Sequence, residues 1–394
     1  MMSKNKKNSF LFFVYLTGLS IIGFLATDMY LPAFDKMRID LNASKSSISA
    51  TMSLFLAGYA IAQLLWGPIS DKAGKPKTVL MGLGIFTIAS LGIYFTENIS
   101  ILLALRLIQA IGVCSAAVCW QALVIEKYPK EETNKVFATI MPLVALSPAL
   151  APLIGAFLLN YFGWRSIFIA LAIIAFLLIL YTLVIKDDKT SGNNSAESSE
   201  TSADKSYFLL LKSHKYLGNV LIYALCSATF FAWLTGSPFF LKELGYNESE
   251  IGFSFFPQTV AFLVGGYGYR SISTKIEGKK LIPGLLILNA SCCIALYLIT
   301  ISMTPTLTIL LIPFCLMAFS NGACYPIVVA EALKSFPGNL GKAAALQNTI
   351  QLGICFLASA AVSIFSKNAL LSTTIVMCCT IPFTFIAYKL SLRG

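Results

Sequence analysis

One acidic residue stands out in the first apolar stretch of the chain. Asp28 lies within the sequence 21–32, and residues 10–26 before it carry no charge. About twenty apolar residues are enough for a helix to cross a bilayer. A carboxylate in such a helix costs about 2.5–3.5 kcal/mol at mid-membrane, so it is usually retained for a function. Reversible proton binding is the chemistry that fits, and the alternative is a carboxylate near the helix end that reaches the interface.

A second unusual charge, Arg106, lies in the apolar stretch 100–123. A buried arginine needs a partner. At a rise of about 1.5 Å per residue, Asp28 is about 6 Å inside Pro32 and Arg106 is about 9 Å inside Ser100. The two charges therefore lie at similar depths if those two helix ends share a side of the membrane. We expect Asp28 and Arg106 to take part together in proton coupling.

Aromatic and amide side chains recur inside the apolar stretches. Aromatic faces stack on flat rings and amides hydrogen-bond their edges, so the set suits an uncharged polar ligand better than a lipophilic cation. The alternative is that buried amides and tyrosines only hold helices together, at about 0.6–2 kcal/mol each. Several members are spaced i, i+4 and share a helix face. The candidate substrate-binding residues are Tyr59, Gln63, Gln109, Trp120, Gln121, Tyr223, Trp233, Gln258, Asn321, Tyr325, Gln347 and Gln351.

Composition places the chain in the membrane. Hydrophobic residues make up 57% and charged residues only 12% of it, about half the charge of a soluble domain. The net charge of +11 comes from short segments between apolar stretches, which argues against nucleic-acid binding. The ten cysteines form no CxxC pair, so neither zinc nor a structural disulfide is expected. No His, Cys and Asp cluster has catalytic spacing, so we expect neither an enzyme nor a metal or organic cofactor.

Turn and cap residues separate twelve apolar stretches, and this predicts an all-α integral membrane protein with twelve transmembrane helices. The predicted spans are 10–32, 48–69, 78–95, 100–123, 136–158, 165–185, 217–240, 251–269, 281–300, 307–330, 343–365 and 370–388.

The organisation is predicted to be two related six-helix bundles. Residues 186–216 are rich in Ser, Asn and acidic residues, which is typical of a flexible linker. They separate an N-terminal bundle, 1–185, from a C-terminal bundle, 217–394. Equivalent boundary residues in the two halves, such as Pro32 and Pro238 or Asn42 and Asn247, recur at nearly constant offsets. Such repeats are the mark of secondary transporters, which bind substrate between the halves.

Basic residues gather in alternate connecting segments, beginning with the N-terminal one. By the positive-inside rule these segments are cytoplasmic. We therefore expect both termini in the cytoplasm and the chain to be a multi-pass protein of the bacterial cytoplasmic (inner) membrane.

Two motifs resemble the major facilitator superfamily. The loop after the second span has the family's pattern Gly-x-x-x-Asp-Lys-x-Gly-Lys, with lysine where the family usually has arginine. Arg106 and Gln109 resemble the family's Arg-x-x-Gln helix. The resemblance implies two six-helix bundles, Asp28 and Arg106 beside one cavity, and a cytoplasmic latch in which Asp71 faces the eleventh span. The latch residues are Gly67, Asp71, Lys72, Gly74 and Lys75.

A narrower resemblance, carried by sequences 26–34, 65–71 and 235–239, is to the proton-coupled Bcr/CflA drug-resistance branch. Within it, sequences 140–152, 231–239 and 343–349 resemble purine nucleoside transporters. This implies a monomer that moves small polar molecules by alternating access, with protons as the coupling ion. Uptake of purine nucleosides by proton symport is the first expectation, and efflux of drugs by proton antiport is the alternative.

Overall fold

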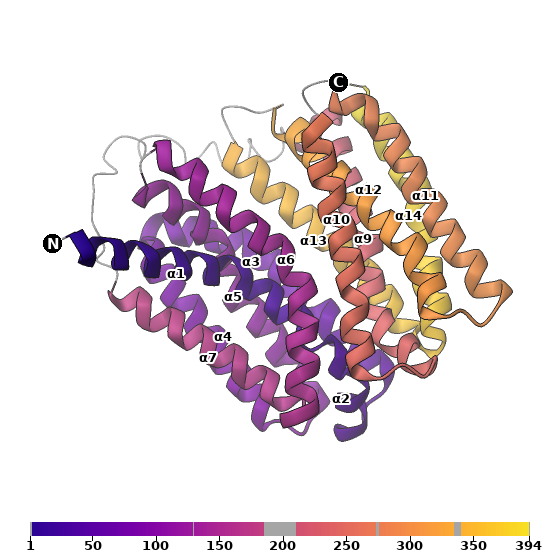
Figure 1. Cartoon of the computed structure of the whole chain (residues 1–394), viewed down its shortest axis with the longest axis horizontal. Coiled ribbons are helices and arrows are strands. Elements are labelled where there is room, and N and C mark those ends of the chain that lie inside the picture. Colours follow the sequence, from indigo (N-terminus) through magenta and orange to yellow (C-terminus); the bar gives the residue numbers. More distant parts are fainter. Residues whose placement is uncertain (1, 129, 185–209, 273–275, 335–339, 394) are drawn as a thin grey trace. The chain divides into compact units, whose positions relative to one another are not determined.

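The computed structural model describes residues 2–128, 130–184, 210–272, 276–334 and 340–393. Long helices dominate it, and no strand occurs in these ranges (Figure 1). Each predicted apolar stretch overlaps one long helix, as expected for the all-α class. In the described residues the long helices are α1 (Met2–Asp28), α3 (Lys45–Ala73), α4 (Lys75–Phe95), α5 (Ile99–Lys127), α6 (Lys130–Phe162), α7 (Arg165–Val184), α9 (His214–Glu243), α10 (Glu248–Ile272), α11 (Gly278–Ser302), α12 (Leu307–Lys334), α13 (Leu340–Ile364) and α14 (Ala369–Ser391).

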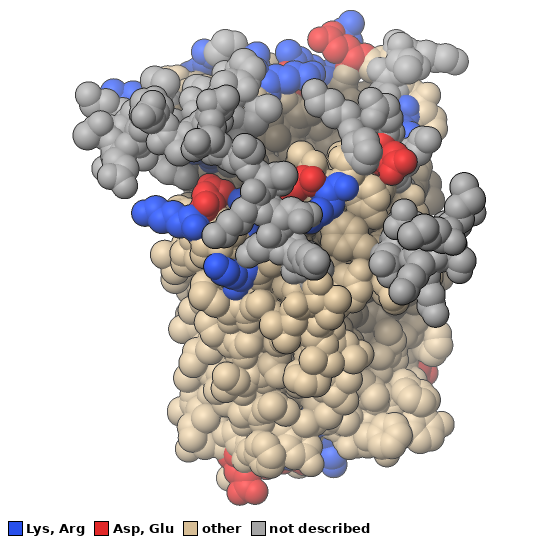
Figure 2. Space-filling model, turned by 90° about the vertical axis from the view of Figure 1, so that its left-hand side faces the viewer, with Lys and Arg blue, Asp and Glu red and all other residues tan. Residues whose placement is uncertain are grey.

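Eleven helices of the described chain are long and apolar enough to cross a membrane. The twelfth, α10, is as long as several of them, but its glycines and Gln258 lower its mean hydropathy. On the face shown in Figure 2, charged side chains gather at the two ends, and the broad band between them is almost entirely uncharged. Such a band is what a bilayer requires of the surface that contacts it.

Local sequence explains where the helices begin and end. Ser44 accepts a hydrogen bond from the Ser47 amide and starts α3, and Asn98 accepts two amides and starts α5, as N-cap residues do. Gly74, with φ +86°, separates α3 from α4, a conformation that favours glycine. The first span is shorter than expected, because α1 ends at Asp28. The chain continues as a short 3₁₀ turn (Leu31–Ala33) and helix α2 (Phe34–Asp40).

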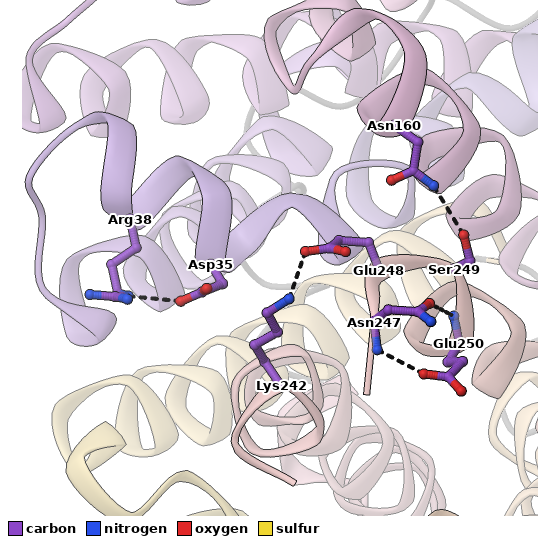
Figure 3. Close-up of polar contacts among 8 residues, drawn as sticks. All are labelled: Asp35, Arg38, Asn160, Lys242, Asn247, Glu248, Ser249 and Glu250. Carbon is purple, nitrogen blue, oxygen red and sulfur yellow. Dashed lines mark hydrogen bonds and ion pairs between the residues drawn. The ribbon is translucent and has the colours of Figure 1, made fainter. Parts of the chain in front are cut away.

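The turn between α9 and α10 is closed by polar contacts (Figure 3). Asn247 accepts the Glu250 amide at 2.9 Å and Glu250 accepts the Asn247 amide at 2.8 Å, the reciprocal arrangement of a capping box. Lys242 donates to Glu248 at 2.8 Å across the same turn. These bonds fix the end of α9 and the start of α10 relative to each other.

The helices form two compact units. Unit 1 comprises Met1–Lys186 and Pro238–Thr259, and unit 2 comprises Asp187–Ser237 and Val260–Gly394. Unit 1 therefore includes the end of α9 and the first half of α10, as well as the N-terminal helices. The division of the chain into bundles 1–185 and 217–394 stays a prediction. Most of the predicted linker, 186–216, lies outside the described residues.

Candidate functional site

Asp28 is the last residue of α1 and is buried, with 3% of its surface exposed. Its carboxylate makes no ion pair with any described residue. The last four carbonyl groups of a helix lack partners inside it, and together they give this end a partial negative charge. An anion at Asp28 adds to that negative charge, whereas a protonated Asp28 does not.

Arg106 of α5 supplies the positive charge at this place. Its guanidinium donates from both terminal nitrogens to the carbonyl oxygen of Ala26, at 3.2 Å each. Because α1 ends two residues after Ala26, this carbonyl is one of the free C-terminal groups. Arg106 therefore caps the end of α1, which is the electrostatically favoured position for a cation. The expected direct pairing of Arg106 with Asp28 is not made in this structure.

Gln109, one turn further along α5, completes the surroundings of Arg106. Its side-chain oxygen accepts from the guanidinium, and its nitrogen donates to Ser90 Oγ at 2.7 Å. Ser90 in turn donates to the carbonyl of Phe86 at 2.7 Å. The oxygen and the nitrogen of Gln109 each make one hydrogen bond inside unit 1, so this residue positions Arg106, and its place in the substrate site stays a prediction.

Three aromatic rings enclose the rest of the guanidinium, which is fully buried. The ring centroids of Tyr30, Phe55 and Phe168 lie 4.1, 4.4 and 5.9 Å from Arg106 Cζ. Cation–π contacts of this kind favour a desolvated cation. Tyr30 is held by a hydrogen bond of 3.1 Å between its hydroxyl and Thr51 Oγ1. These aromatic residues could not be predicted as part of the site from sequence, because phenylalanine and tyrosine are common in apolar stretches.

In unit 2, two of the candidate substrate residues meet. The rings of Tyr223 on α9 and Tyr325 on α12 are perpendicular, with centroids 4.9 Å apart. Phe262 of α10 approaches Tyr325 at 5.7 Å. Cys355 of α13 lies near both tyrosines, and Gln351 donates weakly to its sulfur at 3.9 Å. Four helices thus bring aromatic, amide and thiol groups together.

Two features of α12 set the position of Tyr325. Gly322, one turn earlier, allows the backbones of α12 and α10 to touch, since a Cβ at Gly322 would collide with the carbonyl oxygen of Phe262. Small residues are enriched at such interfaces in membrane helices. Asn321 donates to the Cys226 carbonyl at 3.2 Å and accepts from Asn289 at 2.9 Å. Asn321 therefore ties α12 to α9 and α11.

Other candidate substrate residues occupy more varied environments. Trp233 is buried and stacks on Phe314 at 4.0 Å, and Trp120 is buried edge-on against Phe137. Two buried amides have atoms without a hydrogen-bond partner among the described residues: both polar atoms of Gln258 and the oxygen of Gln347. The remaining three candidates belong to unit 1 and differ in exposure: Tyr59 and Gln63 are half-buried and Gln121 is exposed.

The predicted latch residues lie at the junction of α3 and α4. Lys75 donates to Asp71 at 2.7 Å and approaches the Ser70 carbonyl at 3.4 Å. Asp71 is exposed, and Gly74 supplies the left-handed turn described above. The expected contact of Asp71 with the eleventh span stays a prediction.

The start of α3 and the end of α6 contact the end of α9 and the start of α10 within unit 1. Asn160 of α6 donates to Ser249 Oγ at 3.0 Å (Figure 3). Lys45 at the start of α3 pairs with Glu243, the last residue of α9. Figure 3 also shows Arg38 bonded to Asp35 on α2, at 2.9 Å. Polar contacts thus connect helix ends that are far apart in sequence.

Within the described residues, no group of three or more His, Cys, Asp or Glu side chains is arranged to hold a metal ion. The carboxyl of Asp28 is a buried ionisable group at the end of α1, and its role in proton coupling stays a prediction.

Comparison with known proteins identifies the family. The sequence pattern of the Major Facilitator Superfamily matches residues 16–386. An uncharacterized MFS-type transporter of Bacillus subtilis is 28% identical, over 90% of this chain and 89% of its own. The chloramphenicol resistance protein CraA of Acinetobacter baumannii is 28% identical over 82% and 78%, and a bicyclomycin resistance protein homolog of Haemophilus influenzae is 25% identical over 70% of each.

Solved structures agree on the fold. A D-xylose-proton symporter superposes with a TM-score of 0.75 at 16% identity, covering 95% of this chain and 97% of its own. A bacterial homolog of the lysosomal transporter Spinster gives 0.77 at 13% identity, covering 97% of each chain. At such identities the likeness concerns the fold alone. The match across nearly the whole sequence and the helical architecture together place this chain in the major facilitator superfamily, as a transport protein of the membrane.

Proposed function

We propose that the protein is a proton-coupled exporter of small organic molecules in the bacterial cytoplasmic membrane, working by antiport with both termini in the cytoplasm. The observation that supports this most directly is Asp28, a buried carboxylate without an ion-pair partner at a helix end that Arg106 caps. Relatives named for resistance to chloramphenicol and bicyclomycin favour export over uptake.

Asp28 gives the end of α1 two charge states. When Asp28 is ionised, its carboxylate adds a full negative charge to the partial negative charge of the helix end that Arg106 caps. When Asp28 takes up a proton, Arg106 balances the helix end alone. A proton entering or leaving therefore changes the electrostatic attraction between α1 and α5 at one point, and this change couples the proton to a change of conformation.

Uptake of purine nucleosides, the first expectation from sequence, is the second candidate. The aromatic, hydroxyl and amide groups around Tyr325 favour it, since they suit a heterocyclic base. Two of the three named relatives are drug-resistance proteins, so we rank nucleoside uptake below export.

Inside-out membrane vesicles provide the test. Respiration acidifies their lumen, and an antiporter then concentrates labelled chloramphenicol inside while releasing protons. We expect accumulation by the unaltered protein and by Asp35→Asn, whose acid lies on α2 beside Arg38, but none by Asp28→Asn. Full accumulation by Asp28→Asn would refute the role of Asp28. If right-side-out vesicles instead concentrate labelled inosine in response to an inward proton gradient, uptake replaces export.

A further inference from the structure

Unit 2 contains a group of aromatic and polar side chains whose hydrogen-bonding groups are incompletely paired. We define the tyrosine cluster as Tyr223 and Ser227 of α9, Phe262 of α10, Tyr325 of α12 and Gln351 of α13. Tyr325 is its centre, because it is in edge contact with Tyr223 and Phe262. Ser227 is one turn beyond Tyr223 on α9, close to Tyr325.

The polar groups of the cluster are incompletely paired. Ser227 Oγ is buried, at 3% exposure, and its polar contact with the Tyr325 side chain does not have the geometry of a full hydrogen bond, nor does it make one with another described residue. The nitrogen of Gln351 reaches only the sulfur of Cys355, at 3.9 Å, and sulfur is a weak acceptor. Buried polar groups without partners are costly and usually mark a place that water or a ligand completes. Tyr223, Phe262, Tyr325 and Gln351 are each only half-buried, so the cluster is accessible.

The surrounding packing holds the cluster in place without using these groups. The carboxamide of Asn321 is hydrogen-bonded to Cys226 and Asn289. These bonds fix the α9 and α12 backbones next to Ser227 and Tyr325. The close approach at Gly322 fixes Phe262 of α10. A preorganised set of aromatic and polar groups is what a small-molecule site requires.

Charge decides the class of ligand. None of the five members of the cluster carries a charge at neutral pH, because the tyrosine hydroxyls stay protonated there. The nearby buried acid of unit 2, Glu331, lies six residues after Tyr325 and pairs with Lys279 and Lys334 at 3.1 and 3.0 Å. Among the described residues of unit 2, neither the cluster nor the paired Glu331 offers a free counter-ion to a charged ligand, and an unpaired charge is costly away from water.

We propose, on the basis of the proposed transport function, that the tyrosine cluster is the ligand-binding subsite of unit 2 and takes an uncharged molecule with a flat unsaturated ring and an adjacent polar group. The ring packs on Tyr325, Tyr223 and Phe262. The polar group pairs with Ser227 and Gln351.

Equilibrium binding to the purified full-length protein tests this subsite. The probes are chloramphenicol and inosine, which are uncharged and have a flat ring, and tetraphenylphosphonium, a lipophilic cation. We expect an uncharged probe to bind and tetraphenylphosphonium not to displace it. Tyr325→Ala should weaken binding about tenfold or more, as for the loss of an aromatic contact. The matched control is Tyr297→Ala on α11, also half-buried but outside the cluster.

Conservative variants keep the test valid if Tyr325→Ala folds poorly. Ser227→Ala and Gln351→Leu should each weaken binding about threefold to tenfold, as for one lost hydrogen bond, while leaving the unfolding transition in place. Unchanged affinity in all three variants, with probe bound by the unaltered protein, overturns the subsite but not the proposed function. Tighter binding of tetraphenylphosphonium overturns the ligand class. If the unaltered protein binds neither uncharged probe, the proposed function and the subsite both fail.

Discussion

Removing the negative charge of Asp28 should hardly change the stability of the protein. If Arg106 depended on Asp28 for its charge balance, Asp28→Asn would leave a buried arginine unpaired. Breaking a buried ion pair in this way costs about 3–5 kcal/mol. In the structure, however, Arg106 bonds to the Ala26 carbonyl and to Gln109, and Asp28 makes no ion pair in the described chain.

The magnitudes separate two substitutions. Asparagine has nearly the shape of aspartate, so Asp28→Asn should lower the free energy of unfolding by no more than about 1 kcal/mol, the net value of one ordinary hydrogen bond. Gln109→Leu removes the acceptor of a charged donor and leaves Ser90 without its donor. Hydrogen bonds to charged groups contribute about 1.5–3 kcal/mol, so Gln109→Leu should cost more than Asp28→Asn.

Unfolding of the purified protein in increasing sodium dodecyl sulfate measures this difference. A thiol-reactive fluorescent dye reports unfolding, because seven cysteines are buried in the folded chain. Asp35→Asn provides the control, since it removes an acid whose partner Arg38 is partly exposed, a class of pair with little effect on stability. The reasoning is refuted if Asp28→Asn destabilises the protein by about 3 kcal/mol or as much as Gln109→Leu.

Two further predictions concern packing and use the same unfolding measurement. Gly322→Ala places a Cβ against the Phe262 carbonyl and should lower the free energy of unfolding by about 1–3 kcal/mol through overpacking. The control is Gly284→Ala, which has open space around it and should not change the free energy of unfolding measurably. Equal effects of the two substitutions would show that the α10–α12 contact is not tight. Trp164→Phe removes the 2.9 Å bond from the indole to Asp40 and should cost about 1.5–3 kcal/mol, and an unchanged midpoint would contradict it.

The sequence was sufficient to identify the two charges of the site but not the way they are balanced. Asp28 and Arg106 are conspicuous because ionisable residues are rare in apolar stretches. The partner of Arg106 depends on where α1 ends, since only a free C-terminal carbonyl can accept from it. The apolar stretch continues to Pro32, so its pattern gave no reason to end the helix at Asp28. Helix ends are less certain than helices, and here the end determines the electrostatics.

The tyrosine cluster illustrates the same limit for packing. Tyr223, Tyr325 and Gln351 were identifiable as polar or amphipathic residues within apolar helices. Phe262 was not, because a phenylalanine in such a helix has the same appearance whether it faces lipid, core or ligand. Its place follows from the glycine contact between α10 and α12, which is a relation between two helices and has no signature in either one. For the same reason, the sequence could not show that the amide of Asn321 is hydrogen-bonded to two other helices whereas that of Gln351 makes only a weak contact with sulfur.

The two proposals, an uncharged ligand bound in unit 2 and a proton bound by Asp28 in unit 1, would together have an energetic consequence. A cycle that exchanges a neutral molecule for one or more protons moves net positive charge inward, so the membrane potential contributes about 2.3 kcal/mol per charge per 100 mV to export. A monovalent cation exchanged for a single proton would move no net charge and would be insensitive to the potential. If Asp28 carries the proton and neutral groups bind the ligand, as proposed, both parts of the proton-motive force would be available to drive export.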